Sequence, residues 1–407
     1  MIMLILQHSR AWSVKFCVRS SMGFILAIVI VVAVASVVEN SATSVENLIR
    51  DQGYPFENHT VVTEDGYILT LHRIPHGKNH SGKLGRPVLL WHAILCSSAA
   101  WVLSRPDKAL GFILADQGYD VWLANSRGNT YSKMHKTLSV LSPEYWNFSF
   151  HEIGYYDLPA CIDYILQQTG EDSLQYIGHS QGSTIFFVLA STRPEYNNKV
   201  SHMTALAPIA FLNDAHGIIR VLITFSSVVE FVYQITGNYE FLSASSFVHV
   251  LEKGCVPDTL LGYVCNSIVF LSVGNDPEQW NMTLAYEVYK YIPAGSSLKQ
   301  FSHFSQIAKN GGYFRPYDYS YSKNLEIYAR YEPPCYDLSK ISTPITLYYA
   351  QNDWLSGVQD VMKLHSSLPN SVAKLVPYPA FHHLDFLWAK DVVTLLYDDL
   401  LKTMSEH

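Results

Sequence analysis

This sequence has few charged residues. Of its 407 residues 15% are charged and 48% are hydrophobic, whereas about 25% of an average soluble protein is charged. The formal net charge is −7, and no basic run follows the first twenty residues. Because a nucleic-acid-binding surface must be basic, this composition excludes a nucleic-acid partner. Internal repeats and low-complexity segments are also missing. The length of the chain allows one large or two moderate globular domains.

Clusters of histidine, cysteine and carboxylate at the spacing of metal ligands are missing as well. We therefore expect no metal and no cofactor, and nothing points to an obligatory protein partner. Among the six cysteines, Cys255 and Cys265 enclose a short loop, where a disulfide would contribute about 3 kcal/mol. Cys96, Cys161 and Cys335 have no evident partners and are expected to be buried thiols.

A long apolar run does occur near the N-terminus, over residues 23–38 after a basic stretch. Its sixteen residues fall short of the about 20 that span a bilayer, and they suit a secretory signal. We expect residues 1–35 to be a signal peptide or an uncleaved signal anchor, which sends the rest to the lumen or outside. Four N-glycosylation sequons support this compartment mildly: Asn58, Asn79, Asn147 and Asn281.

Apolar strands alternate with amphipathic helices along much of the chain, which predicts a mostly parallel sheet with helices on both faces, the α/β class. Strands are expected as a hairpin over 61–71 and over 87–91, 119–124, 174–178, 200–207, 345–350 and 373–376. The alternation stops over 211–330, an aromatic-rich stretch that predicts a mainly helical insertion. The expected domains are a core over 36–210 and 331–407, interrupted by this cap.

A Gly-x-Ser-x-Gly pentapeptide, Gly178 to Gly182, lies between an apolar strand and an apolar helix. This context is typical of a nucleophile elbow, in which glycines permit a tight turn and the serine stands above the sheet. Ser180 is therefore the candidate nucleophile. The alternative is an ordinary glycine-rich turn in which the serine caps the helix.

Functional groups of parallel sheets collect beyond the carboxyl ends of the strands. Ser180, Asp353 and the adjacent pair His382 and His383 follow such ends, in the order Ser, Asp, His of the α/β-hydrolases. An imidazole must take the serine proton, and a carboxylate must hold the imidazole tautomer. Either histidine satisfies this pattern.

Three other residues compete for these roles. Asp360 and Asp385 do not directly follow a strand, and Asp385 is expected in the first turn of a helix. His179 is expected to point away from Ser180 and to pack. The tetrahedral oxyanion needs two backbone N–H donors, which we assign to Gln181 and, after the strand that ends at His92, to Ile94.

At these residues the chain resembles the acid lipase family of gastric and lysosomal lipases, over about residues 45–402. The resemblance rests on the strings 118–123 (GYDVWL), 125–130 (NSRGNT), 156–160 (YDLPA), 178–182 (GHSQG), 293–295 (PAG) and 383–386 (HLDF). It implies that His383, directly before Leu-Asp-Phe, is the catalytic histidine, and that Cys255 and Cys265 form a cap disulfide. It further implies an α/β-hydrolase fold and the hydrolysis of triacylglycerols or cholesteryl esters at a lipid–water interface.

The sequence departs from the family pattern at Ala93, where the family has glycine before the oxyanion residue. A left-handed alanine would cost about 1–2 kcal/mol, and a displaced Ile94 N–H would cost about 100- to 1,000-fold in rate. The expected function is a secreted or lysosomal lipase that meets membranes transiently or through an uncleaved anchor. The alternatives are a short-chain carboxylesterase and a catalytically weakened lipid-binding protein.

Overall fold

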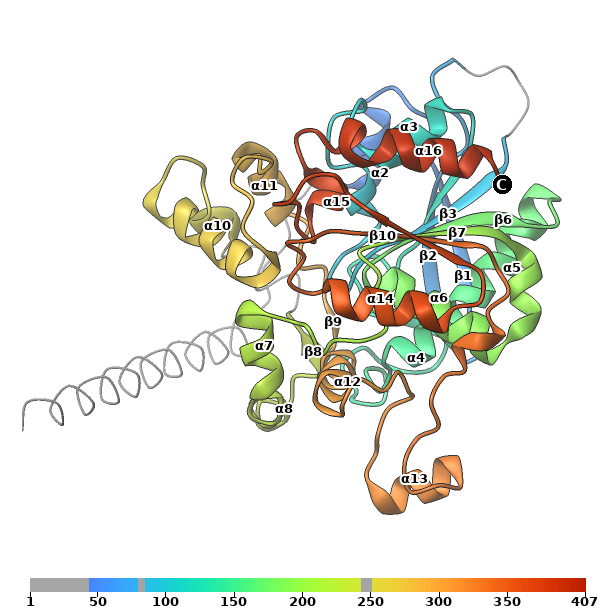
Figure 1. The fold of residues 1–407 in the computed structure, drawn as a ribbon, viewed down its shortest axis with the longest axis vertical. Coiled ribbons are helices and arrows are strands. Elements are labelled where there is room, and N and C mark those ends of the chain that lie inside the picture. Colours follow the sequence, from blue (N-terminus) through green and yellow to red (C-terminus); the bar gives the residue numbers. More distant parts are fainter. Residues whose placement is uncertain (1–43, 80–84, 243–250) are drawn as a thin grey trace, which may run out of the picture.

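A nine-stranded sheet forms the centre of the molecule, with the path β1-β2-β4-β3-β6-β7-β10-β11 and β5 paired to β2 (Figure 1). The computed structural model describes residues 44–79, 85–242 and 251–407, so the predicted signal segment 1–35 lies outside the described residues. Along this path the strands β4, β3, β6, β7, β10 and β11 are parallel to one another, whereas β2 pairs antiparallel with β1, β4 and β5. The predicted α/β class is confirmed.

Most strands match the predicted ranges to within about two residues, but β1 begins four residues before the predicted hairpin, β2 ends three residues after it, and β5 was not predicted. Their bounds are β1 Glu57–Val62, β2 Tyr67–Ile74, β3 Pro87–Trp91, β4 Asp120–Leu123, β5 Met134–His135, β6 Leu174–His179, β7 Val200–Leu206, β10 Ile345–Tyr349 and β11 Ser371–Leu375. Alternate side chains of β3 enter two different cores: Leu89 and Trp91 one, Val88 and Leu90 the other. A strand buried on both faces needs helices on both, which is why its sequence is uninterruptedly apolar.

The helices form one layer on each face of the sheet. Figure 1 shows α2, α3 and α16 on one side and α5, α6 and α14 on the other. The bounds are α2 Val45–Arg50, α3 Leu110–Asp116, α4 Phe150–Glu152, α5 Leu158–Thr169, α6 Gln181–Thr192, α14 Val358–Ser367, α15 Asp385–Trp388 and α16 Asp398–Ser405. Helix α14 was not predicted from the sequence, because its buried apolar residues are few: Val361 and Leu364.

Between β7 and β10 lies the predicted insertion, residues 211–330, called the cap segment below. It contains α7 Gly217–Thr224, α8 Ser226–Ile235, α10 Leu260–Val273, α11 Met282–Tyr289, α12 Leu298–Lys309 and α13 Tyr321–Tyr328, with the short strands β8 Glu240–Phe241 and β9 Ser296–Ser297. No single helix among the described residues has the length and apolarity to cross a membrane. The pair α7–α8 meets that criterion jointly, by length and composition, with a bend of 68°.

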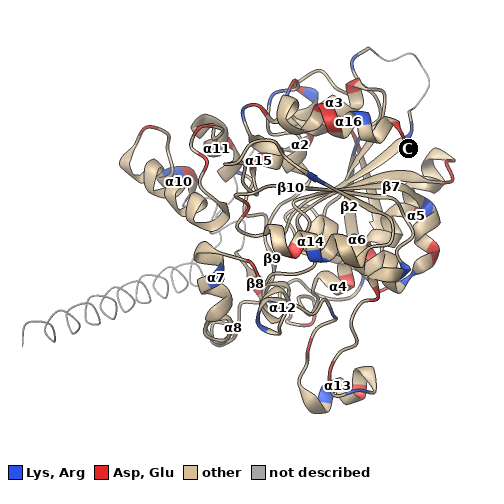
Figure 2. Cartoon of the chain, viewed as in Figure 1, with Lys and Arg blue, Asp and Glu red and all other residues tan. Residues whose placement is uncertain are grey.

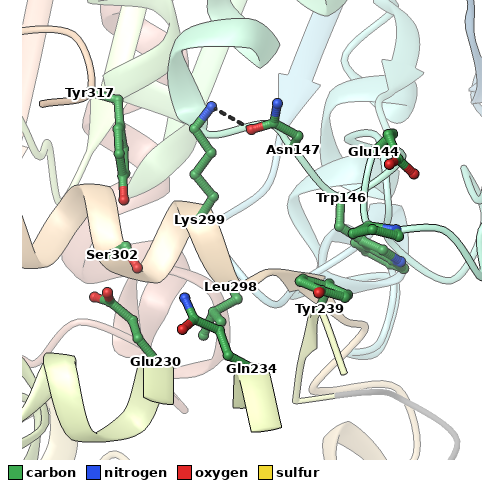
Figure 3. A pocket seen from close by; sticks show the side chains of 11 residues that line it. Glu144, Trp146, Asn147, Glu230, Gln234, Tyr239, Leu298, Lys299, Ser302 and Tyr317 are labelled. Atoms are coloured by element: carbon green, nitrogen blue, oxygen red, sulfur yellow. Dashed lines mark hydrogen bonds between the residues drawn. The ribbon is translucent and has the colours of Figure 1, made fainter. Parts of the chain in front are cut away.

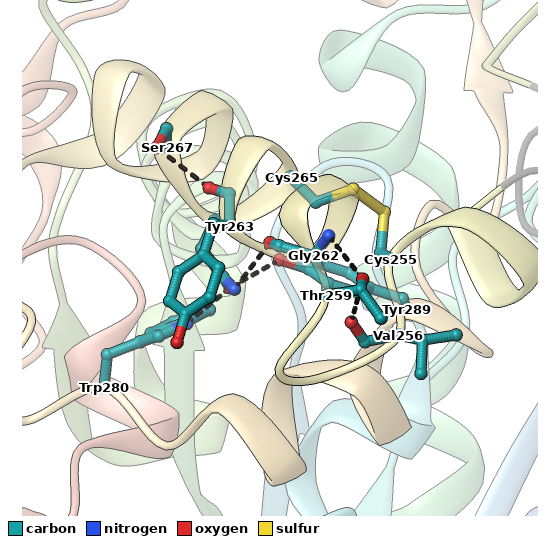
Figure 4. Close-up of a disulfide and its surroundings, with 10 residues drawn as sticks. Cys255, Val256, Thr259, Gly262, Tyr263, Cys265, Ser267, Trp280 and Tyr289 are labelled. Atoms are coloured by element: carbon teal, nitrogen blue, oxygen red, sulfur yellow. Dashed lines mark hydrogen bonds between the residues drawn. A yellow bond between two sulfur atoms is a disulfide. The ribbon is translucent and has the colours of Figure 1, made fainter.

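A disulfide joins Cys255 to Cys265 in the cap segment, as expected, next to Trp280 and Tyr289 (Figure 4). Cys96 and Cys161 are buried thiols, but Cys335 is exposed, so the expectation for that cysteine was wrong. It follows a Pro-Pro pair in a loop, where no strand or helix covers it. The four sequon asparagines are all exposed, a condition for carrying glycans; their glycosylation stays a prediction.

Candidate active site

Ser180 occupies the sharp turn between β6 and α6, with a φ of 54° and a ψ of −115°. Such a backbone is strained for a non-glycine residue and persists because the surroundings enforce it. The Ser180 N–H donates to the Leu206 carbonyl at 2.9 Å, and the Ser180 carbonyl accepts from the Ser183 hydroxyl at 2.5 Å. These bonds hold the strained turn against β7 on one side and α6 on the other.

The two flanking glycines are required by close approach, not by a left-handed backbone. A Cβ on Gly178 would lie 2.6 Å from the backbone of Gly182, and a Cβ on Gly182 would lie 2.2 Å from the carbonyl oxygen of Trp91. Real Cβ atoms do not come that close to backbone, so no larger residue fits. The elbow predicted from the pentapeptide therefore has the expected geometry.

His383 and Asp353 come together from the loops after β11 and β10. The Nδ1 atom of His383 lies 2.8 Å from Oδ2 and 3.0 Å from Oδ1 of Asp353. The N–H groups of Leu355 and Ser356 also donate to Asp353 Oδ1. Burial by itself raises the pKa of Asp353, but the charge and hydrogen bond of His383 and these two N–H groups outweigh it, so the pKa lies below its usual value.

The two neighbouring histidines have other partners. The ring of His179 is tilted by 39° against that of His383, with the ring centroids 4.9 Å apart, and its Nε2 lies 2.9 Å from the His383 carbonyl oxygen. Burial, then repulsion by His383, lowers the pKa of His179 to about 3, so the ring is neutral. It packs, as expected, but directly against His383. The His382 ring is fully buried beside Asp385, with Nδ1 2.9 Å from Oδ2.

The competing carboxylates do not contact His383. Asp360 accepts hydrogen bonds from the side chain of Asn213 and the N–H of Asp214, so it joins α14 to the cap segment. Asp385 begins α15, as expected, and accepts from the N–H of His382 at 2.7 Å. Of the three carboxylates considered, Asp353 is the one paired with His383.

The loop after β3 places Ile94 beside the cap segment. Among the described residues, nothing accepts a hydrogen bond from the N–H of Ile94 or of Gln181, so both stay available to a ligand. Ala93 is not left-handed; Leu95, with φ 64°, is the residue of this loop that is. Ala93 therefore carries no left-handed backbone strain. The carbonyl of Leu95 accepts a hydrogen bond from the N–H of Ala294 at 2.6 Å.

A buried polar network that the sequence analysis missed supports this loop. His92 Nε2 accepts from the N–H of Ser126 at 3.1 Å and lies 3.2 Å from the Asn129 amide nitrogen. Asn125 accepts from the Ser98 N–H and from the Asn129 amide, both at 3.0 Å. Burial lowers the pKa of His92 to about 4, which keeps it neutral and accepting. The sequence signal that could have indicated this network is the pair of asparagines in the Asn-Ser-Arg-Gly-Asn string, residues 125–129.

The described pocket in Figure 3 has a volume of about 340 Å³ and lies between α8, α12 and the loop before α4. Its walls include Trp146, Tyr239 and Lys299, and Lys299 Nζ donates to the sequon residue Asn147 at 3.0 Å. Neither Ser180 nor His383 lines it. The catalytic candidates themselves are covered, each 3% exposed.

The fold and this arrangement define an α/β-hydrolase. A family described as "alpha/beta hydrolase fold" matches residues 86–236, and a "partial alpha/beta-hydrolase lipase region" matches residues 45–105. Among solved structures, a putative lipase from Sulfolobus solfataricus superposes with a TM-score of 0.56 at 13% identity, over 86% of this chain and 94% of that one. At that identity the likeness establishes the fold alone.

Sequence relatives establish the family. Lipase 3 of Drosophila melanogaster is 40% identical over 88% of this chain and 92% of its own. Human gastric triacylglycerol lipase is 39% identical over 89% and 91%, and human lysosomal acid lipase/cholesteryl ester hydrolase is 38% identical over 89% and 91%. The chain belongs to this family of gastric and lysosomal acid lipases. It is a lipase of the secretory pathway.

Proposed function

We propose that the protein hydrolyses the ester bonds of neutral lipids, triacylglycerols or cholesteryl esters, with Ser180, His383 and Asp353 as its catalytic triad. The observation that carries this proposal is the His383–Asp353 pair, 2.8 Å apart, whose histidine contacts His179, the residue before Ser180 on the strained elbow. The names of the two human relatives specify these substrates: triacylglycerol for the gastric lipase and cholesteryl ester for the lysosomal acid lipase.

In the proposed mechanism the Ser180 hydroxyl attacks the ester carbonyl while His383 Nε2 takes its proton. Asp353 holds the other ring nitrogen and stabilises the imidazolium. The N–H groups of Ile94 and Gln181 bind the oxyanion of the tetrahedral intermediate. The leaving alcohol takes the proton from His383, and an acyl-Ser180 ester remains. Water then repeats the sequence with His383 as base, releasing the fatty acid and restoring the serine.

The surroundings of the site support a long apolar acyl group. Leu95, next to Ile94, packs against a cap cluster that includes Val229, Tyr233 and Leu298. Leu384, next to His383, packs against a second cap cluster around Trp280. Apolar walls on both sides of a reacting ester bind hydrocarbon and exclude water.

The outer surface of the cap segment supports contact with a lipid–water interface. α8 and α10 expose Phe231, Ile235, Leu260 and Leu261, each more than half accessible. Few charged positions interrupt these two helices in Figure 2. Exposed apolar patches of this kind mark surfaces that meet membranes or other partners. Secretion or delivery to the lysosome, and transient or anchored membrane contact, belong to the same proposal.

The direct test is to label the purified protein with a fluorophosphonate and to map the adduct by mass spectrometry. We expect one adduct on Ser180 in the wild type and none in Ser180→Ala. Labelling of another residue would contradict the triad, and an unlabelled wild type would favour a lipid-binding protein. Rates on p-nitrophenyl butyrate and on emulsified long-chain triacylglycerol then separate a lipase from a short-chain carboxylesterase, which would prefer the butyrate.

A further inference from the structure

The end of cap helix α10 is hydrogen-bonded to the loop of Asp353, and that loop is hydrogen-bonded in turn to the loop of His383. The Trp354 N–H, next to Asp353, donates to the Val273 carbonyl at 3.3 Å. The side-chain amide of Asn352 donates to the Asn275 carbonyl at 3.1 Å and to the Ala380 carbonyl at 2.8 Å. This seam between cap and core therefore runs directly behind Asp353 and His383.

Two carboxyl groups are fully buried in this seam and lie within interacting distance of each other: Asp276 from the cap segment and Asp385 from the start of α15, two residues after His383. One oxygen of each has a backbone donor: Asp276 Oδ1 accepts from Gln279 at 3.1 Å, and Asp385 Oδ2 accepts from His382 at 2.7 Å. The other oxygens, Asp276 Oδ2 and Asp385 Oδ1, are buried and accept no hydrogen bond from any described residue.

Two buried carboxylates that each keep one oxygen without a donor are unfavourable when both are ionised at low dielectric. One proton between them satisfies both free oxygens, because the protonated carboxyl donates to the other. Burial is the main reason why the pKa of Asp276 is raised to about 6; the charge of Asp385 and a hydrogen bond between the two carboxyls raise it further, against the Gln279 N–H and His382, which lower it. Like-charged dyads titrate in this way.

We propose that Asp276 is a positioning residue for His383, because the proton it shares with Asp385 ties the cap segment to the loop that presents the catalytic histidine. Asp385 closes that loop through its bond to the His382 N–H, and the Asp385 N–H returns to the His382 carbonyl at 3.0 Å. When the proton is lost, the two carboxylates repel and this closure loosens next to His383. The inference rests on the proposed role of Ser180 and His383.

Other titratable groups around the pair are of two kinds. The fully buried His382 ring contacts Asp385 directly, and Phe270 and Trp280 pack around it. Four of the remaining ones lie at the outer edge of the seam, where water screens their charge: Glu278, Tyr378, Lys390 and Asp391. His179 and Asp353 lie on the other side, in contact with His383.

The test measures kcat and KM on p-nitrophenyl butyrate from pH 4.5 to 8 for the full-length protein. We expect wild-type kcat to fall as the pH rises through about 6, by about tenfold per unit above it, with little change in KM. Asp276→Asn carries a permanent amide donor, so it should keep the low-pH kcat within about twofold and lose the fall. Asp276→Ala, which has no donor, should be slow at every pH.

Three further variants decide where the effect originates. Asp385→Asn should also abolish the fall, since its amide donates to Asp276 and its oxygen still accepts from His382, and it serves if Asp276→Asn does not fold. Asp391→Asn, an exposed carboxylate of the same seam, should leave the profile unchanged. A fall that persists in both pair variants, or one that disappears in His382→Gln instead, overturns the proposal. Fluorophosphonate labelling of wild-type Ser180 shows independently whether the triad proposal survives.

Discussion

The imidazole of His179 packs against the imidazole of His383 with the ring centroids 4.9 Å apart, and its Nε2 lies 2.9 Å from the His383 carbonyl oxygen. The residue directly before the candidate nucleophile is thus in contact with the candidate base. Because the ring of His179 is neutral, its Nε2–H donates to that carbonyl and fixes the backbone of the histidine loop. The elbow and the loop are one packed unit.

His179 predicts a loss of stability in acid. Its folded-state pKa is about 3, below the unfolded value of about 6.5, so the unfolded chain binds a proton first. The stability it contributes is present above pH 6.5 and is lost as the pH falls towards 3. His179→Gln, which keeps a donor at the same place, should lose less Tm between pH 6.5 and 4. The exposed His216→Gln is the control and should follow the wild type.

Asp353→Asn should lower kcat by about 1,000- to 10,000-fold, because the amide no longer holds the His383 tautomer or stabilises its positive charge. The fold should survive, since asparagine still accepts from the Leu355 and Ser356 N–H groups. Steady-state kinetics and circular dichroism check both statements. Asp360→Asn is the matched control. A loss in that variant equal to the loss in Asp353→Asn would argue against the assigned pair.

Gly182→Ala should prevent stable folding, because its Cβ would lie 2.2 Å from the Trp91 carbonyl oxygen in the packed sheet. Gly170→Ala separates this clash from backbone strain: Gly170 has φ 72° and open space around its Cβ position. We expect it to cost about 1 kcal/mol. Soluble yield and chemical denaturation provide the comparison, and equal effects of the two changes would refute the close-packed elbow.

Ala93→Gly should leave kcat within about twofold of the wild type. The backbone at Ala93 is not left-handed, so a glycine there relieves no strain and does not change the position of the Ile94 N–H. Leu95→Ala should be more damaging, since Leu95 packs against the cap cluster of Val229 and Tyr233. Kinetics of the two variants on one soluble ester suffice. A large gain in Ala93→Gly would mean that the alanine does weaken the oxyanion loop.

Much of the fold could be predicted because its signals are local. Strand β3 is apolar at every position since it is buried on both faces, and the strand–glycine–serine–glycine–helix order around Ser180 is written in consecutive residues. The carboxyl-end rule for parallel strands then selected Asp353 and the histidine pair without coordinates. The helices inside the cap segment were harder to predict, because its aromatic residues do not recur with a single period.

The choice between His382 and His383 could not be made from the residues alone, since neighbouring side chains differ in direction by packing, not by sequence. In the fold one ring faces Asp353 and the other is buried beside Asp385. The same limit applied to Ala93: the departure from the family pattern predicted possible backbone strain at this residue. The left-handed residue is Leu95, held by a hydrogen bond from Ala294 in a distant segment.

By itself the sequence determined the sheet, the elbow and the order of the catalytic candidates, because alternation and turn chemistry act between residues close along the chain. The tertiary structure alone decided which carboxylates pair, which histidines are neutral and that Asp276 meets Asp385 beside the histidine loop. Protonation depends on burial and on neighbours brought together from distant segments, and neither is encoded at any single position.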